Sequence, residues 1–127
     1  MSFLKKPKKH VLIVDDEPMI VQMTQEFLEE EQFRVSGAGD TEQAAKILEG
    51  DHVDAVLLDI RLPNEDGLSF LQKIKAAYPH IGVVMLTGSG YEENLMQTAL
   101  HYGASGYVSK DTDLENVVVA LKRALKS

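Results

Sequence analysis

The sequence predicts an α/β protein built on a doubly wound parallel sheet. Short apolar runs without alternation lie at residues 11–14, 55–58 and 83–86, and such runs fit strands that are covered on both faces. Stretches with apolar residues at helical spacing separate these runs, and parallel strands need helical, right-handed crossovers. We therefore expect five strands that alternate with five helices in three layers.

The individual elements follow from local signals in chain order. Helices are expected from near Pro18, after Asp40 or Thr41, after residues 66–67, from about residue 91 to 102, and after residues 112–113. Asp16 is expected to cap the first helix, because Asp is favoured at that position and Pro in the first turn. The helix at 91–102 has a thin apolar stripe, so we expect it to pack loosely. The strands are expected at residues 10–14, 33–38, 55–59, 81–86 and 106–109.

Length and composition limit the classes of protein. The 127 residues suit one domain, and the absence of cysteine excludes disulfides and thiolate metal sites. No apolar run reaches the length of a membrane span and no secretory signal is present, so no membrane contact and a cytoplasmic location are expected. The net charge of −7 argues against nucleic-acid binding by this domain. The basic residues 1–9 are expected to form an extension before a domain at 10–127.

Polar side chains end four of the expected strands. Asp15 and Asp16 follow the first, Asp59 ends the third, Thr87 follows the fourth and Lys110 follows the fifth. The carboxyl ends of parallel strands meet at one edge of the sheet, where open α/β sheets bind ligands. We therefore expect these five side chains to gather at that edge.

Such a group suits phosphoryl transfer. Three clustered carboxylates repel one another, and a hard cation such as Mg²⁺ relieves this strain. A carboxylate can attack phosphorus to give an aspartyl phosphate. Lys110 would supply a fixed positive charge and Thr87 a hydroxyl for the phosphoryl oxygens. Each residue alone has a structural explanation, as a cap, a turn residue or a solvated lysine, but their shared position favours a site.

Four segments carry a resemblance to a known family. Residues 14–18, 58–63, 86–88 and 109–110 resemble the signature segments of receiver domains (CheY-like) of two-component response regulators, and the likeness spans roughly residues 10–125. It implies a flavodoxin-like sheet of order 2-1-3-4-5. It also implies a phosphorelay role, in which the chain would catalyse only its own phosphorylation and dephosphorylation and is otherwise not an enzyme.

The resemblance assigns roles residue by residue. It implies that Asp59 is the phosphoacceptor and that Asp15, Asp16 and Asp59 hold Mg²⁺ together with the backbone carbonyl of Arg61. Lys110 would bind the phosphate. Thr87 would be the switch hydroxyl, and Tyr107 the switch aromatic. Many receivers have proline after this lysine, whereas residue 111 is aspartate here.

The implied partners are a sensor histidine kinase or a phosphotransfer protein. The four histidines, His10, His52, His80 and His101, lack ligand spacing and are expected at the surface, so the phosphohistidine would belong to the partner. The face made of the helix at 91–102, the strand at 106–109 and the last helix is the expected switching and homodimer surface. Residues 103–112 resemble receivers joined to helix-turn-helix regulators, so a DNA-binding output domain would follow in a larger parent protein.

Other functions fit the sequence less well. A flavin-binding protein of the same topology needs a phosphate-binding loop after the first strand, where residues 15–17 are all acidic. A haloacid-type phosphatase needs a second aspartate at position 61, which is arginine. The remaining alternatives are a free-standing receiver and an interaction module that works without phosphorylation. Bound magnesium would distinguish the latter from a working receiver.

Overall fold

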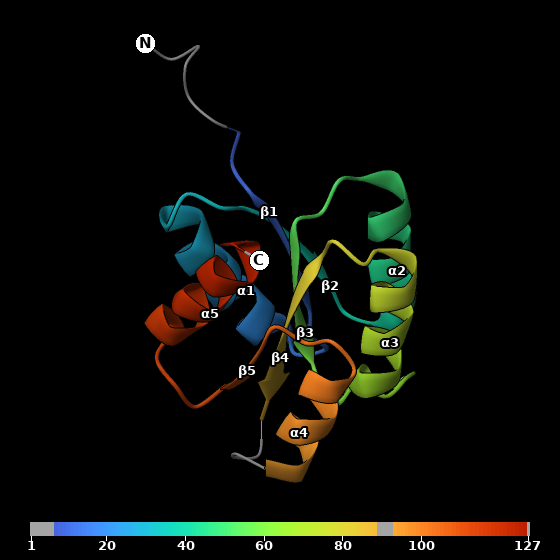
Figure 1. Ribbon diagram of the computed structural model, residues 1–127. Coiled ribbons are helices and arrows are strands. Elements are labelled where there is room, and N and C mark those ends of the chain that lie inside the picture. The colour runs from blue at the N-terminus through green and yellow to red at the C-terminus, as the bar shows by residue number, and fades with distance from the viewer. Residues whose placement is uncertain (1–6, 89–92, 127) are drawn as a thin grey trace.

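The computed structural model describes residues 7–88 and 93–126. Five strands form one parallel sheet in the order β2-β1-β3-β4-β5, which confirms the predicted topology. Helices cover both faces of the sheet, as Figure 1 shows, so the described part of the chain has three layers. The strands are β1 His10–Val14, β2 Arg34–Ala38, β3 Ala55–Asp59, β4 Gly82–Thr87 and β5 Gly106–Ser109.

The helices divide between the two faces. Helices α1 and α5 cover one face, whereas α2, α3 and α4 lie on the other (Figure 1). The central strands β1 and β3 are buried at every residue because both faces are covered. The helices are α1 Pro18–Glu30, α2 Thr41–Gly50, α3 Gly67–Ala77, α4 Glu93–His101 and α5 Leu114–Lys126.

Local capping confirms two expected helix starts and corrects a third. Asp40 accepts a hydrogen bond from the Gln43 backbone N–H at 2.8 Å, so Asp40 caps α2. Asp66 likewise begins α3. The prediction that Asp16 caps the first helix is wrong. The N-cap of α1 is Glu17, whose backbone N–H is bound by the Asp15 carboxylate at 2.9 Å.

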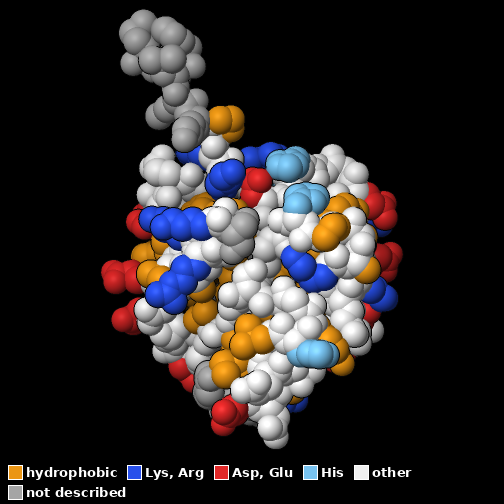
Figure 2. Space-filling model, in the orientation of Figure 1, with side chains coloured by type: hydrophobic (Ala, Val, Ile, Leu, Met, Phe, Trp, Pro, Cys, Tyr) orange, Lys and Arg blue, Asp and Glu red, His pale blue; other side chains and the backbone are white. Residues whose placement is uncertain are grey.

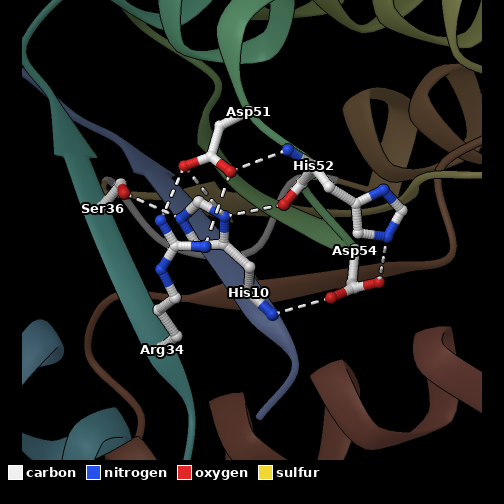
Figure 3. A network of polar contacts seen from close by, with 6 residues as sticks. All are labelled: His10, Arg34, Ser36, Asp51, His52 and Asp54. Carbon is white, nitrogen blue, oxygen red and sulfur yellow. Dashed lines mark hydrogen bonds and ion pairs between the residues drawn. The ribbon is translucent and has the colours of Figure 1, made fainter. Parts of the chain in front are cut away.

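The expectation that all four histidines lie at the surface is wrong for His10. Its side chain is 2% exposed. Both ring nitrogens have partners, the carbonyl oxygen of His52 at 2.8 Å and the hydroxyl of Ser36 at 2.7 Å (Figure 3). Because a polar ring with both nitrogens bonded can be buried at little cost, His10 lies inside the domain.

Two expected segments fall partly outside the described residues. The basic extension at 1–9 is described only from residue 7, and residues 7–9 are exposed. The expected helix at 91–102 is described from Glu93 and ends at His101. Gly103 follows it with φ of +102°, a conformation that glycine adopts without steric cost. None of the helices within the described ranges combines the length and hydropathy needed to cross a membrane.

Candidate functional site

The acidic residues meet because β1 and β3 are neighbours in the sheet. Val14 pairs with Leu58, so the next residue on each strand, Asp15 and Asp59, leaves the sheet at the same edge. Both side chains are buried, with 0% of Asp15 and 4% of Asp59 exposed. Two carboxylates at the end of a packed hydrophobic sheet are costly unless a cation accompanies them.

The Asp59 carboxylate is held by one backbone and one side-chain donor. The Arg61 backbone N–H donates to Oδ1 at 3.1 Å, and the Lys110 ammonium donates to Oδ2 at 3.0 Å. Burial raises the pKa of the Asp59 carboxyl above its ordinary value, and these two donors only partly oppose that rise. Asp59 is therefore a desolvated carboxylate with a fixed orientation.

Lys110 is the cation that joins the acidic residues. Its Nζ lies 2.8 Å from Asp15 Oδ2, 2.9 Å from Glu17 Oε1 and 3.0 Å from Asp59 Oδ2. Burial lowers the pKa of Lys110, but the three carboxylates outweigh burial and raise it well above its ordinary value. The ammonium therefore stays charged throughout the physiological range.

One lysine does not neutralise the whole acidic group. Asp15, Asp16, Glu17 and Asp59 each offer a carboxylate oxygen, and these oxygens all lie within 4.8 Å of one another. Asp16 and Glu17 face solvent while Asp15 and Asp59 are buried. An all-oxygen group with excess negative charge and an open side is the kind of site that hard divalent cations occupy. The donor set therefore fits Mg²⁺, with Asp15, Asp16 and Asp59 as candidate ligands.

The remaining predicted residues lie around this group. Thr87 is the last residue of β4 and is 1% exposed, and its carbonyl accepts the Lys110 backbone N–H at 2.8 Å. The Arg61 backbone lies against Asp59, while the Arg61 side chain is exposed. Tyr107 on β5 is half-buried and packs against the α2–α3–α4 side of the core. Residues 89–92, which follow Gly88 after the end of β4, lie outside the described residues.

Sequence reasoning missed two contributors to the site. Glu17 contacts Lys110, and the only sequence signal was a third acid next to Asp15 and Asp16. Gly67 lets α3 approach the end of β3, because a Cβ there would lie 2.3 Å from the Asp59 carbonyl oxygen and 2.7 Å from Ile60 Cα. The signal for Gly67 was a glycine at a helix start, where a helix-favouring residue is usual.

Comparisons with known proteins agree with this fold. The family model described as "Response regulator receiver domain" matches residues 11–122. A solved CheY-like receiver domain from Methanospirillum hungatei superposes with a TM-score of 0.86 at 29% identity, covering 94% of each chain.

Curated relatives extend well beyond the matched region. A putative NtrX-like response regulator of Rickettsia felis is 40% identical over 90% of this chain and 24% of its own length. The probable transcriptional regulatory protein TcrX of Mycobacterium tuberculosis is 34% identical over 91% of this chain and 49% of its own length. This chain thus spans about a quarter to a half of these relatives. With a family match over residues 11–122, the chain belongs to the response regulator receiver domains of two-component signalling.

Proposed function

We propose that Asp59 is the phosphoacceptor of this receiver domain. The observation that carries the proposal is the contact set of its carboxylate, which ends a central strand and touches both Lys110 and the Arg61 backbone N–H. These donors fix the orientation of the carboxylate, and the Lys110 charge stands ready for the phosphoryl oxygens. Receiver domains as a family accept phosphoryl groups and interact with histidine kinases.

The chemical step needs one bond made and one broken. An Asp59 oxygen attacks phosphorus as the bond from phosphorus to the donor's imidazole nitrogen breaks, and the electron pair leaves with the imidazole. Lys110 then moves its charge from Asp59 to the transferred group, while its contacts with Asp15 and Glu17 keep it in place. Hydrolysis by water later returns the free carboxylate, so no separate substrate is turned over.

We further propose Mg²⁺ as the cofactor, held by Asp15, Asp16, Asp59 and the Arg61 backbone carbonyl. The support is the excess of carboxylates over cations in the acidic group. A bound Mg²⁺ would supply positive charge for both the carboxylates and the phosphoryl oxygens. Asp16 is the exposed member of the set, so its carboxylate can turn toward an incoming ion without crossing the core.

The proposed response to phosphorylation runs through Thr87 and Tyr107. A phosphate on Asp59 adds acceptor oxygens one strand away from the Thr87 hydroxyl. Thr87 pairs with Ser109 across to β5, so movement at Thr87 reaches the strand that carries Tyr107. The face of α4, β5 and α5 is the proposed surface for a partner or a homodimer. A receiver domain at 10–127, after a basic extension at 1–9, would act as the input part of a larger regulator.

The test is covalent modification of the full chain by acetyl phosphate with Mg²⁺, followed by intact mass spectrometry. We expect one phosphate adduct, its loss in Asp59→Asn, and its retention in the control Asp111→Asn, which changes an exposed acid next to Lys110. An adduct that persists in Asp59→Asn would refute the acceptor assignment. Failure of the unaltered chain to form any adduct would favour an interaction module that works without phosphorylation.

A further inference from the structure

The loop between α2 and β3 is fixed by the buried ring of His10. The carbonyl of His52 can only accept, so the His10 nitrogen beside it at 2.8 Å, Nδ1, carries the proton. Nε2 then accepts from the Ser36 hydroxyl at 2.7 Å. The Asp51 carboxylate accepts the His52 backbone N–H at 2.8 Å and pairs with Arg34 at 2.7 Å. Figure 3 shows this network at the start of the strands, and it leaves His52 on a rigid backbone.

Asp54 in the same loop is oriented toward His52. Its Oδ2 accepts the His10 backbone N–H at 2.8 Å, so Oδ1 is turned to the other side, 3.0 Å from His52 Nε2 (Figure 3). Metal–nitrogen and metal–oxygen bonds of ~2.0–2.1 Å at a tetrahedral angle place two ligand atoms about 3.3 Å apart. The two side chains are 74% and 18% exposed, so an ion can reach them from solvent. Two ligand atoms are therefore already spaced as a transition-metal ion requires.

His80, in the turn before β4, lies near His52 and is the candidate for a third ligand. Its ring is nearly parallel to that of His52, with centroids 6.3 Å apart. Two imidazoles that bind one ion through nitrogen at a tetrahedral angle have centroids about 5.2 Å apart, so the His80 ring must move about 1 Å closer to the His52 ring to share an ion with it. Figure 2 shows histidine side chains next to each other on the surface at this end of the molecule. Because His80 is exposed, rotation about its side-chain bonds can turn a nitrogen toward His52.

The two loops are also held together through their backbones. The Gly82 N–H donates to the Asp54 carbonyl at 3.3 Å. The Lys75 ammonium binds the carbonyls of Pro79 and Ile81 at 2.9 and 2.7 Å, on either side of His80. The position of His80 relative to His52 is thus set by the fold, and only side-chain rotation is needed to complete the set.

We propose that His52 Nε2, Asp54 Oδ1 and a ring nitrogen of His80 form a binding site for a divalent transition-metal ion such as Zn²⁺. Imidazole ligands favour Zn²⁺ over Mg²⁺, so this site and the acidic group select different ions. Within residues 7–88 and 93–126, ligand atoms of three or more side chains already converge only in the acidic group. The His52–Asp54–His80 site is a second one, at the opposite edge of the sheet, which needs one rotation to close.

The site has a defined outer layer. The His10 backbone N–H that holds Asp54 and the His10 ring that holds the His52 carbonyl orient two of the three ligands. The ion binds the unprotonated nitrogen of each neutral imidazole, so protons compete with the ion for both rings.

The test is a Zn²⁺ titration of the full chain by calorimetry, with excess Mg²⁺ to fill the acidic group. Imidazole ¹⁵N spectra identify the ligands. We expect one Zn²⁺ per chain, with shifts at His52 and His80 only. His80→Ala and His52→Ala should each weaken binding at least tenfold. His101→Ala is the control, since His101 is exposed on α4 with its ring beside Tyr102.

Several results would overturn the site. Equal Zn²⁺ affinity in His80→Ala and the unaltered chain would exclude His80, and loss of binding in His101→Ala would place the ion elsewhere. Zn²⁺ binding that disappears in Asp59→Asn would show that the ion occupies the acidic group. Conversely, Zn²⁺ binding that survives in Asp59→Asn supports the site whatever the outcome of the phosphorylation test.

Discussion

The two edges of the sheet solve the problem of buried polar groups in opposite ways. At the carboxyl edge, Asp15 and Asp59 are buried with one lysine between them, and the pKa of Asp59 is raised. At the amino edge, His10 is buried with both ring nitrogens bonded, and the pKa of Asp51 is lowered by its hydrogen bond from Arg34. The carboxyl edge holds more buried negative charge than its lysine compensates, whereas at the amino edge both ring nitrogens of His10 have hydrogen-bond partners.

The contrast separates a region with uncompensated buried charge from a region whose buried ring is fully hydrogen-bonded. A desolvated carboxylate gains when a cation or a phosphoryl group arrives, so ligands can shift the carboxyl edge strongly. The His10 network has little to gain from further partners within the domain, so it stabilises the sheet. Four substitutions test this difference.

The largest expected effect is at Lys110. Lys110→Met leaves Asp15 and Asp59 buried without their cation, so we expect the free energy of unfolding to fall by about 3 kcal/mol without Mg²⁺. Added Mg²⁺ should recover part of the loss. Urea unfolding with and without Mg²⁺ measures both the loss of unfolding free energy and its recovery. The control Lys73→Met removes a surface ion pair with Glu65 and should cost less than about 1 kcal/mol. Equal losses in the two variants would contradict the comparison.

Next is the packing that supports the carboxyl edge. Gly67→Ala places a Cβ against the backbone of Asp59 and Ile60, which cannot move aside, and should destabilise the domain by about 3 kcal/mol. Gly50→Ala at the end of α2 meets nothing within 4 Å and should change stability by less than about 0.5 kcal/mol. Thermal unfolding of both variants is the measurement. If Gly67→Ala left the thermal stability unchanged, α3 would not need this close approach to the end of β3.

At the amino edge, His10→Leu removes the partner of two buried polar groups. The Ser36 hydroxyl and the His52 carbonyl lose their bonds, so we expect a loss of about 2 kcal/mol in unfolding free energy. Formation of the Asp59 adduct at a temperature where the variant stays folded should be unchanged. His101→Leu, at an exposed position, is the matched control. An adduct that forms many times more slowly in His10→Leu would show that the two edges are coupled.

The smallest effect concerns the exposed Arg34–Asp51 pair. The pKa of the Asp51 carboxyl in the folded protein lies below its ordinary value of 3.8. The contribution of the pair to stability is therefore present above that value and is lost as the pH falls through the lowered pKa. Arg34→Gln should therefore lower the melting temperature slightly at pH 7, with the difference vanishing in strong acid. Lys46→Gln, an exposed change on α2, should show no such pH dependence. A difference that grows in acid would reverse the assigned sign.

Sequence patterns were sufficient to predict the bounds of strands where the apolar runs are unambiguous. The strands at 10–14 and 55–59 have the expected bounds, because continuous apolar runs end there in polar residues, and the strand at 106–109 also has the expected bounds. Parallel pairing then places Asp15, Asp59, Thr87 and Lys110 at one edge without further information. Their roles in phosphorylation and metal binding stay predictions.

What the sequence could not supply depends on contacts between distant segments. Burial of His10 needs a hydroxyl from β2 and a carbonyl from the loop after α2, and neither is visible near residue 10. Asp16 was a reasonable cap by type, but the Asp15 carboxylate accepts the Glu17 N–H and the N-cap is Glu17, while the helix begins at Pro18 as expected. The approach of His80 to His52 likewise arises only when two loops meet at the amino edge.

The reach of Lys110 has a consequence for the order in which the chain is made. Lys110 lies 93 residues after Glu17 and 51 after Asp59, and it contacts both. On the ribosome, the acids of the first and third strands emerge well before the cation that joins them. A nascent chain that stops short of residue 110 carries the carboxylates without their ammonium, and their repulsion opposes docking of the finished sheet. A chain in which Lys110 holds the Asp59 carboxylate is therefore one whose synthesis has passed the fifth strand.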